Sequence, residues 1–305
     1  MKVLITGGAG FIASTIADRY IALGHDVVIV DSLITGQKRN IPEQATFYQM
    51  DIGDPAIADV FAKEKPDVVN HHAAQIDVRK SVADPANDAV VNIIGGLNLL
   101  QCCVAHGVKK FIFASTGGAI YGEQDYFPAD EQHPTRPLSP YGITKLTTEK
   151  YLHFYHHTHG LKYTVLRYAN VYGPRQNPHG EAGVVAIFCK RMLSGDQPVI
   201  NGDGKQTRDY VFVDDVVQAN ALALEGGDQM TYNVGTGVET DVNQLFHMLA
   251  DAVDHDVEEK HGPGAAGEQQ RSVLDAGLIQ RELGWKPTVE IATGLHRTMA
   301  FFRSL

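Results

Sequence analysis

A glycine-rich turn near the amino terminus separates a short apolar run from a longer segment of helical period. Residues 2–6 are expected to form a strand and residues 11–23 a helix, with Gly7-Gly8-Ala9-Gly10 between them. Such a turn brings backbone N–H groups and the helix N-terminus onto a pyrophosphate, and larger side chains would block the approach. The turn alone could also be a tight corner with no ligand. The surrounding strands and helices therefore decide whether it binds a pyrophosphate.

Strand-like runs and helical segments alternate through the first two-thirds of the chain. The other expected strands are residues 27–31, 46–50, 68–70, 110–114 and 163–168, and the expected helices include residues 86–106 and 140–157. Strands that alternate with helices are typical of a parallel sheet covered on both faces. The sequence therefore predicts a Rossmann-type, doubly wound α/β domain over residues 1–173.

The alternation ends near residue 173, where proline and glycine become frequent. Two loop-rich stretches follow, marked by Pro174, Pro178, Gly180 and Gly183 and by Gly262, Pro263, Gly264 and Gly267. Residues 174–305 are expected to form a smaller C-terminal substrate-binding domain. One further strand, near residues 231–234, is expected to return to the main sheet.

Charge and composition exclude several classes of protein. The chain has 26 Lys and Arg against 36 Asp and Glu, a net charge of −10, which opposes binding to nucleic acid through phosphate contacts. We find no apolar run of about 18 residues that would cross a membrane, and the N-terminus reaches glycine too early for a signal peptide. Three cysteines make a poor disulfide framework. A soluble cytoplasmic protein is expected.

An acidic residue follows the glycine turn at the spacing expected for dinucleotide binding. Asp31 stands 21 residues after Gly10, at the end of the second expected strand. A carboxylate there accepts a hydrogen bond from the adenosine ribose 2′-OH and would repel a 2′-phosphate. Ala13 replaces the third glycine of the pattern and is still small enough for close helix–strand packing. We therefore expect NAD, rather than NADP, as the cofactor.

A tyrosine and a lysine lie one helical turn apart near the start of the helix at residues 140–157. Tyr141 and Lys145 share one face of this helix, which Ser139 and Pro140 are expected to begin. A lysine ammonium favours the phenolate and lowers a tyrosine pKa from about 10 towards neutrality, which makes a general base for an alcohol. By itself the pair could equally be an exposed pair of little consequence.

Two hydroxyl residues follow the expected strand at residues 110–114. Ser115 and Thr116 would stand at the carboxyl edge of the sheet, where open α/β folds bind ligands. A hydroxyl there could relay a proton, although it could also only satisfy the backbone of the strand end. The histidine pairs His71-His72 and His156-His157 have no cysteine or carboxylate at metal-ligand spacing, so no metal site is expected.

The chain resembles the extended short-chain dehydrogenase/reductase family, and within it the NAD-dependent nucleotide-sugar epimerases of the UDP-glucose 4-epimerase type. The resemblance covers nearly the whole chain and includes TGGAGFIA, HHAAQIDVRKSV, FASTGGAIYGE, SPYGITK, LRYANVYGPRQ and GKQTRDYVFVDDV. It implies a UDP-sugar substrate. It also implies a homodimer in which residues 86–106 and 140–157 pair into a four-helix bundle.

The resemblance assigns roles to residues by their position in these motifs. Those implied to bind NAD are Gly7, Gly10, Phe11, Ile12, Asp31, Ser32, Asp51, Ile52, His72, Ala73, Ala74, Gln75, Asn92, Tyr141, Lys145 and Tyr168. Those implied to contact the UDP-sugar are Thr116, Asn170, Arg208 and Ser272. Arg208 matches the arginine that holds the diphosphate, and Ser272 the residue that lines the pocket for the sugar's C2 substituent.

The residues after the hydroxyl pair separate the reactions that this family performs. Many epimerases carry a run of serines where this chain has Ser115-Thr116-Gly117-Gly118, so Thr116 is expected to be the proton relay, with Ser115 second. Similar dehydratases carry an Asp-Glu pair here, and decarboxylases a glutamate. Residues 117–120 of this chain cannot move a proton. A 4-keto sugar formed here can only take its hydride back, which is epimerization.

The resemblance leaves the sugar open. UDP-glucose and UDP-galactose lead, and UDP-N-acetylglucosamine and UDP-glucuronate are the alternatives. A non-enzymatic NAD-sensing scaffold is the alternative of another class. Such relatives typically lose the tyrosine or the lysine, and Tyr141 and Lys145 are both present here.

Overall fold

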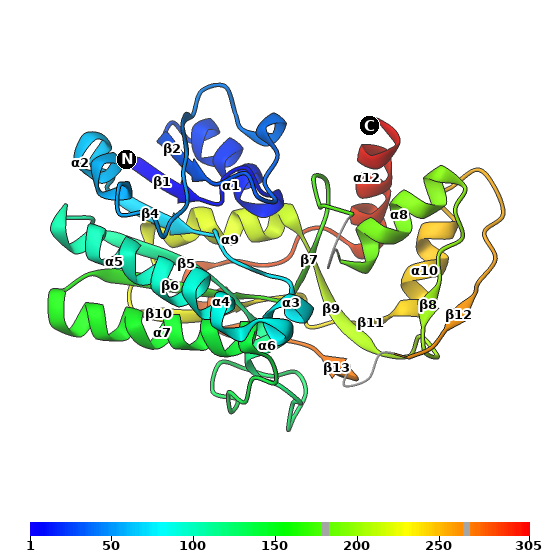
Figure 1. The fold of residues 1–305 in the computed structure, drawn as a ribbon. Coiled ribbons are helices and arrows are strands. Elements are labelled where there is room, and N and C mark those ends of the chain that lie inside the picture. Colours follow the sequence, from blue (N-terminus) through cyan, green and yellow to red (C-terminus); the bar gives the residue numbers. More distant parts are fainter. Residues whose placement is uncertain (179–182, 265–268) are drawn as a thin grey trace.

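A seven-stranded parallel sheet forms the centre of the protein, in a computed structural model that describes residues 1–178, 183–264 and 269–305 (Figure 1). Gly180 and Gly267, expected in loops, lie outside the described residues. The strand order is β10-β6-β5-β4-β1-β2-β3, with all pairs parallel. The strands are β1 (Lys2–Thr6), β2 (Asp26–Asp31), β3 (Thr46–Gln49), β4 (Val68–His71), β5 (Lys110–Thr116), β6 (Lys162–Tyr168) and β10 (Met230–Val234). The doubly wound fold is confirmed.

Helices cover both faces of this sheet and give it two hydrophobic cores. Successive strand residues point to opposite faces, so Val3 and Ile5 pack with α1 (Phe11–Ala22) and α9 (Val213–Glu225). Leu4 packs in the other core, against α2 (Ile57–Glu64), α5 (Gly95–Ala105) and α7 (Pro140–His159). Both faces of β1 are therefore apolar, as expected for a buried parallel strand.

One helical run differs inside from the simple helix expected over residues 86–106. It consists of α4 (Pro85–Ala89), a π-helical turn η2 (Val90–Ile94) and α5. The wider turn contains Asn92, which is buried and bonds to Asp88 one turn earlier. Turns of this kind occur often at functional sites.

The same run, Pro85–Ala105, corrects the expectation that the chain has no segment apolar enough to cross a membrane. By length and composition it qualifies, with a mean hydropathy of 1.5 over its best window, of which 44% is buried inside the protein. Asp88 and Asn92 within it are buried and hydrogen-bonded to residues of other elements. The run packs on the sheet as a core helix, and core helices of this kind can be as long and as apolar as a membrane span.

The C-terminal part of the chain builds a smaller sheet and a group of helices at one end of the molecule (Figure 1). Strand β9 (Thr207–Phe212) pairs with β7 (Asn170–Tyr172), β11 (Glu239–Asp241) and β13 (Arg271–Ser272). The other elements there are α8 (Val184–Ser194), β8 (Ile200–Asn201), α10 (Val242–Ala250), β12 (His261–Gly262) and α12 (Ile291–Arg303). Helix α11 (Gly277–Leu283) instead packs against β10 of the main sheet. The expected return to the main sheet is confirmed, because β10 pairs with β6.

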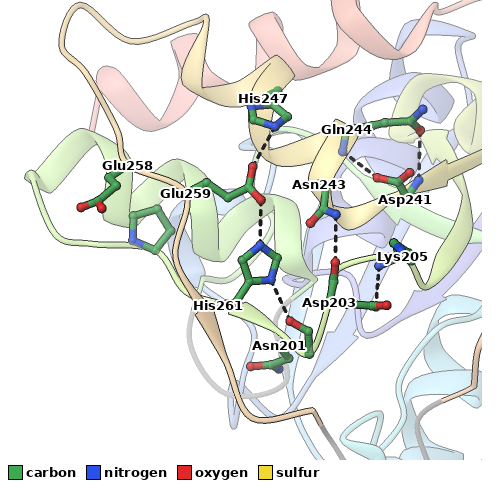
Figure 2. Close-up of polar contacts among 12 residues, drawn as sticks. Asn201, Asp203, Lys205, Asp241, Asn243, Gln244, His247, Glu258, Glu259 and His261 are labelled. Carbon is green, nitrogen blue, oxygen red and sulfur yellow. Dashed lines mark hydrogen bonds and ion pairs between the residues drawn. The ribbon is translucent and has the colours of Figure 1, made fainter.

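A polar clamp holds β8 and β12 against α10 (Figure 2). Glu259 accepts hydrogen bonds from His247 Nε2 at 2.8 Å and His261 Nε2 at 2.7 Å. His261 Nδ1 faces the carbonyl oxygen of Gly202 at 2.7 Å. Both ring nitrogens of His261 thus face acceptors, and Glu259 and then the Gly202 carbonyl raise its pKa. The clamp fixes the chain before it continues to β13.

Candidate active site

The glycine turn lies where the strand order reverses, between the carboxyl ends of β1 and β4. Gly7 has φ +70°, and a Cβ there would lie 2.7 Å from the backbone nitrogen of Ala73. Gly10 is the N-cap of α1, and because it is a glycine no side chain covers the first turn of the helix. Open α/β sheets bind ligands at such a switch point. The cradle therefore fits the diphosphate of a dinucleotide, and Phe11 and Ile12 follow it in α1.

Asp31 ends β2 beside this turn. Its carboxylate is buried and accepts from the backbone nitrogens of Ala9 at 2.9 Å and Leu33 at 2.7 Å. A Cβ on Gly36 would lie 2.7 Å from the same carboxylate. Asp31 thus fixes the glycine turn, and its remaining lone pairs are available to a ribose hydroxyl. Its role towards the ribose stays a prediction, as do those of Ser32, Asp51 and Ile52.

Buried amides attach the segment after β4 to α7. The nitrogen of Gln75 donates to Asn92 Oδ1 at 2.9 Å, and Asn92 Nδ2 donates back to the carbonyl of Gln75 at 3.0 Å. Asp88 accepts from Gln75, Asn92 and the Thr144 hydroxyl. The segment that contains Ala73 and Ala74 is thereby held next to the helix that carries Tyr141.

Tyr141 and Lys145 lie at the start of α7, which begins as the sequence predicts. Ser139 is the N-cap and accepts from the nitrogen of Gly142, and proline stands at the first helical position. Lys145 Nζ donates to the carbonyl of Ala114 at 2.9 Å and lies 5.9 Å from the centre of the Tyr141 ring. Burial lowers the pKa of the Lys145 ammonium to about 8. The carboxylates of Asp88 and Glu149 act in the opposite direction, so Lys145 is mostly a cation at neutral pH.

The two hydroxyl residues at the end of β5 face different surroundings. Ser115 is buried and donates to Glu149 Oε1 at 2.7 Å. Glu149 also holds Arg167 through a buried ion pair with a shortest distance of 2.6 Å. Thr116 is less buried and accepts from the nitrogen of Ala119 at 3.2 Å, which leaves its hydroxyl hydrogen able to donate elsewhere. This arrangement favours Thr116 over Ser115 as the proton relay.

Residues of the smaller sheet approach the same strand end. Asn170 stands in β7, and its Oδ1 lies 3.6 Å from where a Cβ on Gly118 would be. In β9 and β13, Arg208 and Ser272 are paired in register although 64 positions separate them. Ser272 is buried. The expected sugar- and diphosphate-binding residues thus come from strands that the smaller sheet places together.

Asp209 organises this sheet, and the sequence analysis missed it. It is buried and accepts from the backbone nitrogens of Thr236, Gly237 and Leu274. The Thr236 hydroxyl also donates to it at 2.6 Å. Burial raises the pKa of Asp209, and these donors lower it. The signal in the sequence was an acidic residue within an apolar strand, directly after Arg208. A buried carboxylate needs hydrogen-bond donors around it, so such a residue indicates a structural role.

One histidine of each pair in the sequence is held by a hydrogen bond. His71 Nδ1 lies 2.7 Å from the Thr6 hydroxyl, and His156 Nδ1 lies 3.2 Å from the carbonyl oxygen of Leu161. Among residues 1–178, 183–264 and 269–305, no group of three or more His, Cys, Asp or Glu is arranged to hold a metal ion.

Comparisons with known proteins agree with this geometry. The NAD dependent epimerase/dehydratase family matches residues 3–235. The UDP-glucose 4-epimerase of Mycolicibacterium smegmatis is 44% identical over 311 residues, which cover 100% of this chain and 99% of the relative. A crystal structure of the Thermotoga maritima UDP-glucose 4-epimerase with UDP-glucose is 51% identical, with a TM-score of 0.98 and coverage of 100% and 99%. The Thermus thermophilus UDP-glucose 4-epimerase in complex with NAD is 44% identical, with a TM-score of 0.95 and 99% coverage of each chain.

Replacing Asp88 with asparagine is expected to lower the Lys145 pKa below about 8, because burial is then opposed chiefly by Glu149. The change should be on the order of one pKa unit, as for a buried opposite charge. Titration of the Lys145 ε-carbon by NMR in ¹³C-lysine-labelled protein measures it. Asp84→Asn is the control, since Asp84 is an exposed helix cap that asparagine can replace. An unchanged Lys145 titration in Asp88→Asn would contradict the assignment.

Proposed function

This chain belongs to the NAD dependent epimerase/dehydratase family, and from that premise we propose that it interconverts UDP-glucose and UDP-galactose with NAD as its cofactor. The observation that carries the proposal is the strand end at Thr116. Lys145 bonds to the carbonyl of Ala114 on the same strand and lies 5.9 Å from the centre of the Tyr141 ring. The residues after Thr116, Gly117 and Gly118, have no acid or base to divert the reaction. The chain covers the full length of the relatives compared.

Each residue at this strand end has a defined task in the proposed reaction. Bound NAD supplies the hydride acceptor and donor for carbon 4 of the sugar. Tyr141 removes the proton of the 4-hydroxyl, with Thr116 as the relay, and returns it when the 4-keto sugar is reduced. Lys145 places a positive charge near the Tyr141 ring, which favours the phenolate. The backbone carbonyl of Ala114 holds Lys145 in that position.

Epimerization also requires that the nucleotide be held firmly while the sugar turns. A 4-keto sugar that kept its first orientation would only be reduced back to the starting sugar. We assign the firm contact to Arg208, whose guanidinium suits a diphosphate, and Asn170 to the sugar side. Gly117 and Gly118 have no side chains, so they offer the sugar no polar side-chain contact on that side.

A second copy of the chain is proposed to cover an exposed apolar face. Val90 and Ile94 on η2 are more than half exposed, and Ile143 and Phe154 on α7 are about half exposed. The two helical elements pack against each other, so these side chains belong to neighbouring helices. Pairing this face with its copy would form the four-helix bundle that the resemblance implies.

Three buried free cysteines support the proposed cytoplasmic location.

The purified protein is expected to convert UDP-galactose into UDP-glucose, and Tyr141→Phe to lower turnover by about 10² to 10⁴ because the ionisable oxygen is lost. Chromatography of the two UDP-sugars measures the conversion. Tyr151→Phe, on the same helix, is the matched control and should keep wild-type turnover. Activity of Tyr141→Phe within a few-fold of wild type would remove Tyr141 from the mechanism.

The width of the sugar pocket is a separate prediction that concerns Ser272. A serine leaves room that a tyrosine ring would fill, and this room is comparable to an acetamido group. We therefore expect UDP-N-acetylglucosamine to be epimerized as well, and Ser272→Tyr to remove this activity selectively. The expected penalty is that of a steric clash, on the order of 1–3 kcal/mol or more. Equal losses for both sugars, or none for either, would place the pocket wall elsewhere.

The dimer is tested by placing a charge on its proposed interface. Ile94→Asp is expected to shift the mass in solution from two copies to one, because a carboxylate would be buried without a partner. Light scattering after size-exclusion chromatography measures the mass. Val238→Asp is the control, since Val238 is also more than half exposed but lies near β11. If Ile94→Asp still has the mass of a dimer, the interface lies on another face.

A further inference from the structure

His72 has one ring nitrogen that the protein leaves without a partner. The residue directly follows β4, and its ring stacks on that of Tyr168 with centroids 6.1 Å apart. Nε2 lies 3.2 Å from the Tyr168 hydroxyl. Nδ1 is buried, and no hydrogen-bond partner for it occurs in the described part of the chain. Buried polar atoms of this kind are rare, so Nδ1 calls for an explanation.

A chain of hydrogen bonds runs from the backbone carbonyl of Val216 through Asn220 and Tyr168 to His72, and it determines which nitrogen of the His72 ring carries hydrogen. The carbonyl of Val216 can only accept, so the group 2.8 Å from it is the amide nitrogen of Asn220. The second hydrogen of that nitrogen is directed to the Tyr168 hydroxyl at 2.8 Å. Asn220 Oδ1 accepts from Asn70 at 3.0 Å, which fixes the same orientation of the amide.

The orientation of the Asn220 amide determines which way the hydrogen bond between Tyr168 and His72 runs. Its oxygen already accepts from Asn220, so its own hydrogen is free to be donated to His72 Nε2. In the reverse arrangement, the Tyr168 hydrogen and the Nδ1 lone pair would both be buried without partners. Donation by Tyr168 leaves one such group instead of two and is therefore favoured.

Burial and the charge of Lys145 keep the ring of His72 neutral. Together they lower its pKa to about 3, burial being the larger cause. In a neutral imidazole only one nitrogen carries hydrogen. Because Nε2 accepts, that nitrogen is Nδ1. The unpartnered atom is thus a hydrogen-bond donor, and only an acceptor can satisfy it.

We propose that the Nδ1–H of His72 donates a hydrogen bond to an acceptor oxygen of the bound dinucleotide, on the stretch formed by its diphosphate and its nicotinamide ribose. The position supports this stretch: the His72 carbonyl carbon lies 3.0 Å from where a Cβ on Gly7 would be, so the residue adjoins the glycine turn. On the other side it faces Tyr168. The inference rests on the proposed NAD-dependent function and adds a specific donor to it.

The network makes this donor ready before the cofactor arrives. The first of its bonds lies within α9, the second joins α9 to β6, and the third joins β6 to the residue after β4. The orientation of the ring and the placement of its hydrogen are thus set by the fold before the cofactor binds. Preorganised contacts of this kind give more affinity than the same contacts on mobile side chains.

Two substitutions of His72 separate the donor from the rest of the ring. The amide of asparagine reaches the position of Nδ1, and that of glutamine the position of Nε2. His72→Gln is expected to weaken binding of NAD and of ADP-ribose to the full-length protein about tenfold by calorimetry. His72→Asn is expected to bind both within about threefold of wild type. Equal losses in the two variants, or none in His72→Gln, would overturn the proposal.

ADP-ribose identifies the part of the dinucleotide that accepts the hydrogen bond. It contains the diphosphate and the second ribose but no nicotinamide. A loss in His72→Gln for both ligands supports the proposed stretch. A loss for NAD with unchanged ADP-ribose binding would move the contact to the nicotinamide amide and overturn the assignment.

The tautomer can be observed directly by ¹⁵N NMR of histidine-labelled protein without cofactor, with His72→Asn to assign the signals. We expect hydrogen on Nδ1 at pH 7, and a mixture of tautomers in Tyr168→Phe, where the hydroxyl donor is lost. Hydrogen on Nε2, or on both nitrogens, would refute the inference. None of these measurements uses a UDP-sugar. A protein that gives the expected NMR and binding results but does not convert UDP-galactose would support this inference and refute the proposed function.

Discussion

The close approach of the glycine turn to the end of β4 is the contact on which the site depends. Gly7 lies so near the Ala73 nitrogen that any Cβ would collide with it, and its positive φ excludes most other residues. Because β1 and β4 are neighbours at the point where the strand order reverses, this contact places the phosphate cradle beside the segment that leads to Gln75. Asp31 holds the other side of the turn through Ala9. The cofactor cradle is thus a property of backbone packing rather than of any one side chain.

A buried ion pair fixes the helix of the proposed chemistry against the central sheet. Glu149 lies two turns after Tyr141 on α7, and Arg167 stands on β6, so their contact fixes the helix against the sheet. Ser115 on β5 joins the same carboxylate. Breaking a buried pair by removing one partner typically costs about 3–5 kcal/mol, because the other charge is left uncompensated. Such a pair is therefore a strong constraint on where Tyr141 lies relative to Thr116.

Local patterns in the sequence were enough for the sheet and for the tyrosine–lysine pair, since apolar runs and helix caps such as Ser139 act over a few residues. The smaller sheet could not be predicted in the same way. The pairing of Ser272 with Arg208 joins strands far apart in the chain. The carboxylate of Asp209 holds two distant segments, at Thr236 and at Leu274, that share no local pattern. The tautomer of His72 was also out of reach, because it depends on a carbonyl 144 positions away, at Val216.

Packing around the strand end also limits which reactions this chain can acquire. A Cβ on Gly117 would collide with the side chain of Leu274, so an acidic residue at that position would require Leu274 to move. Leu274 is in turn fixed by the Asp209 carboxylate, which accepts from its backbone nitrogen. A Cβ on Gly118 would meet nothing closer than 3.6 Å, so that position is sterically open. The packing of Leu274 thus disfavours an acidic residue at Gly117, whereas Gly118 has room for one. The strand contacts that fix the backbone of Leu274 therefore also act against a competing acid at Gly117.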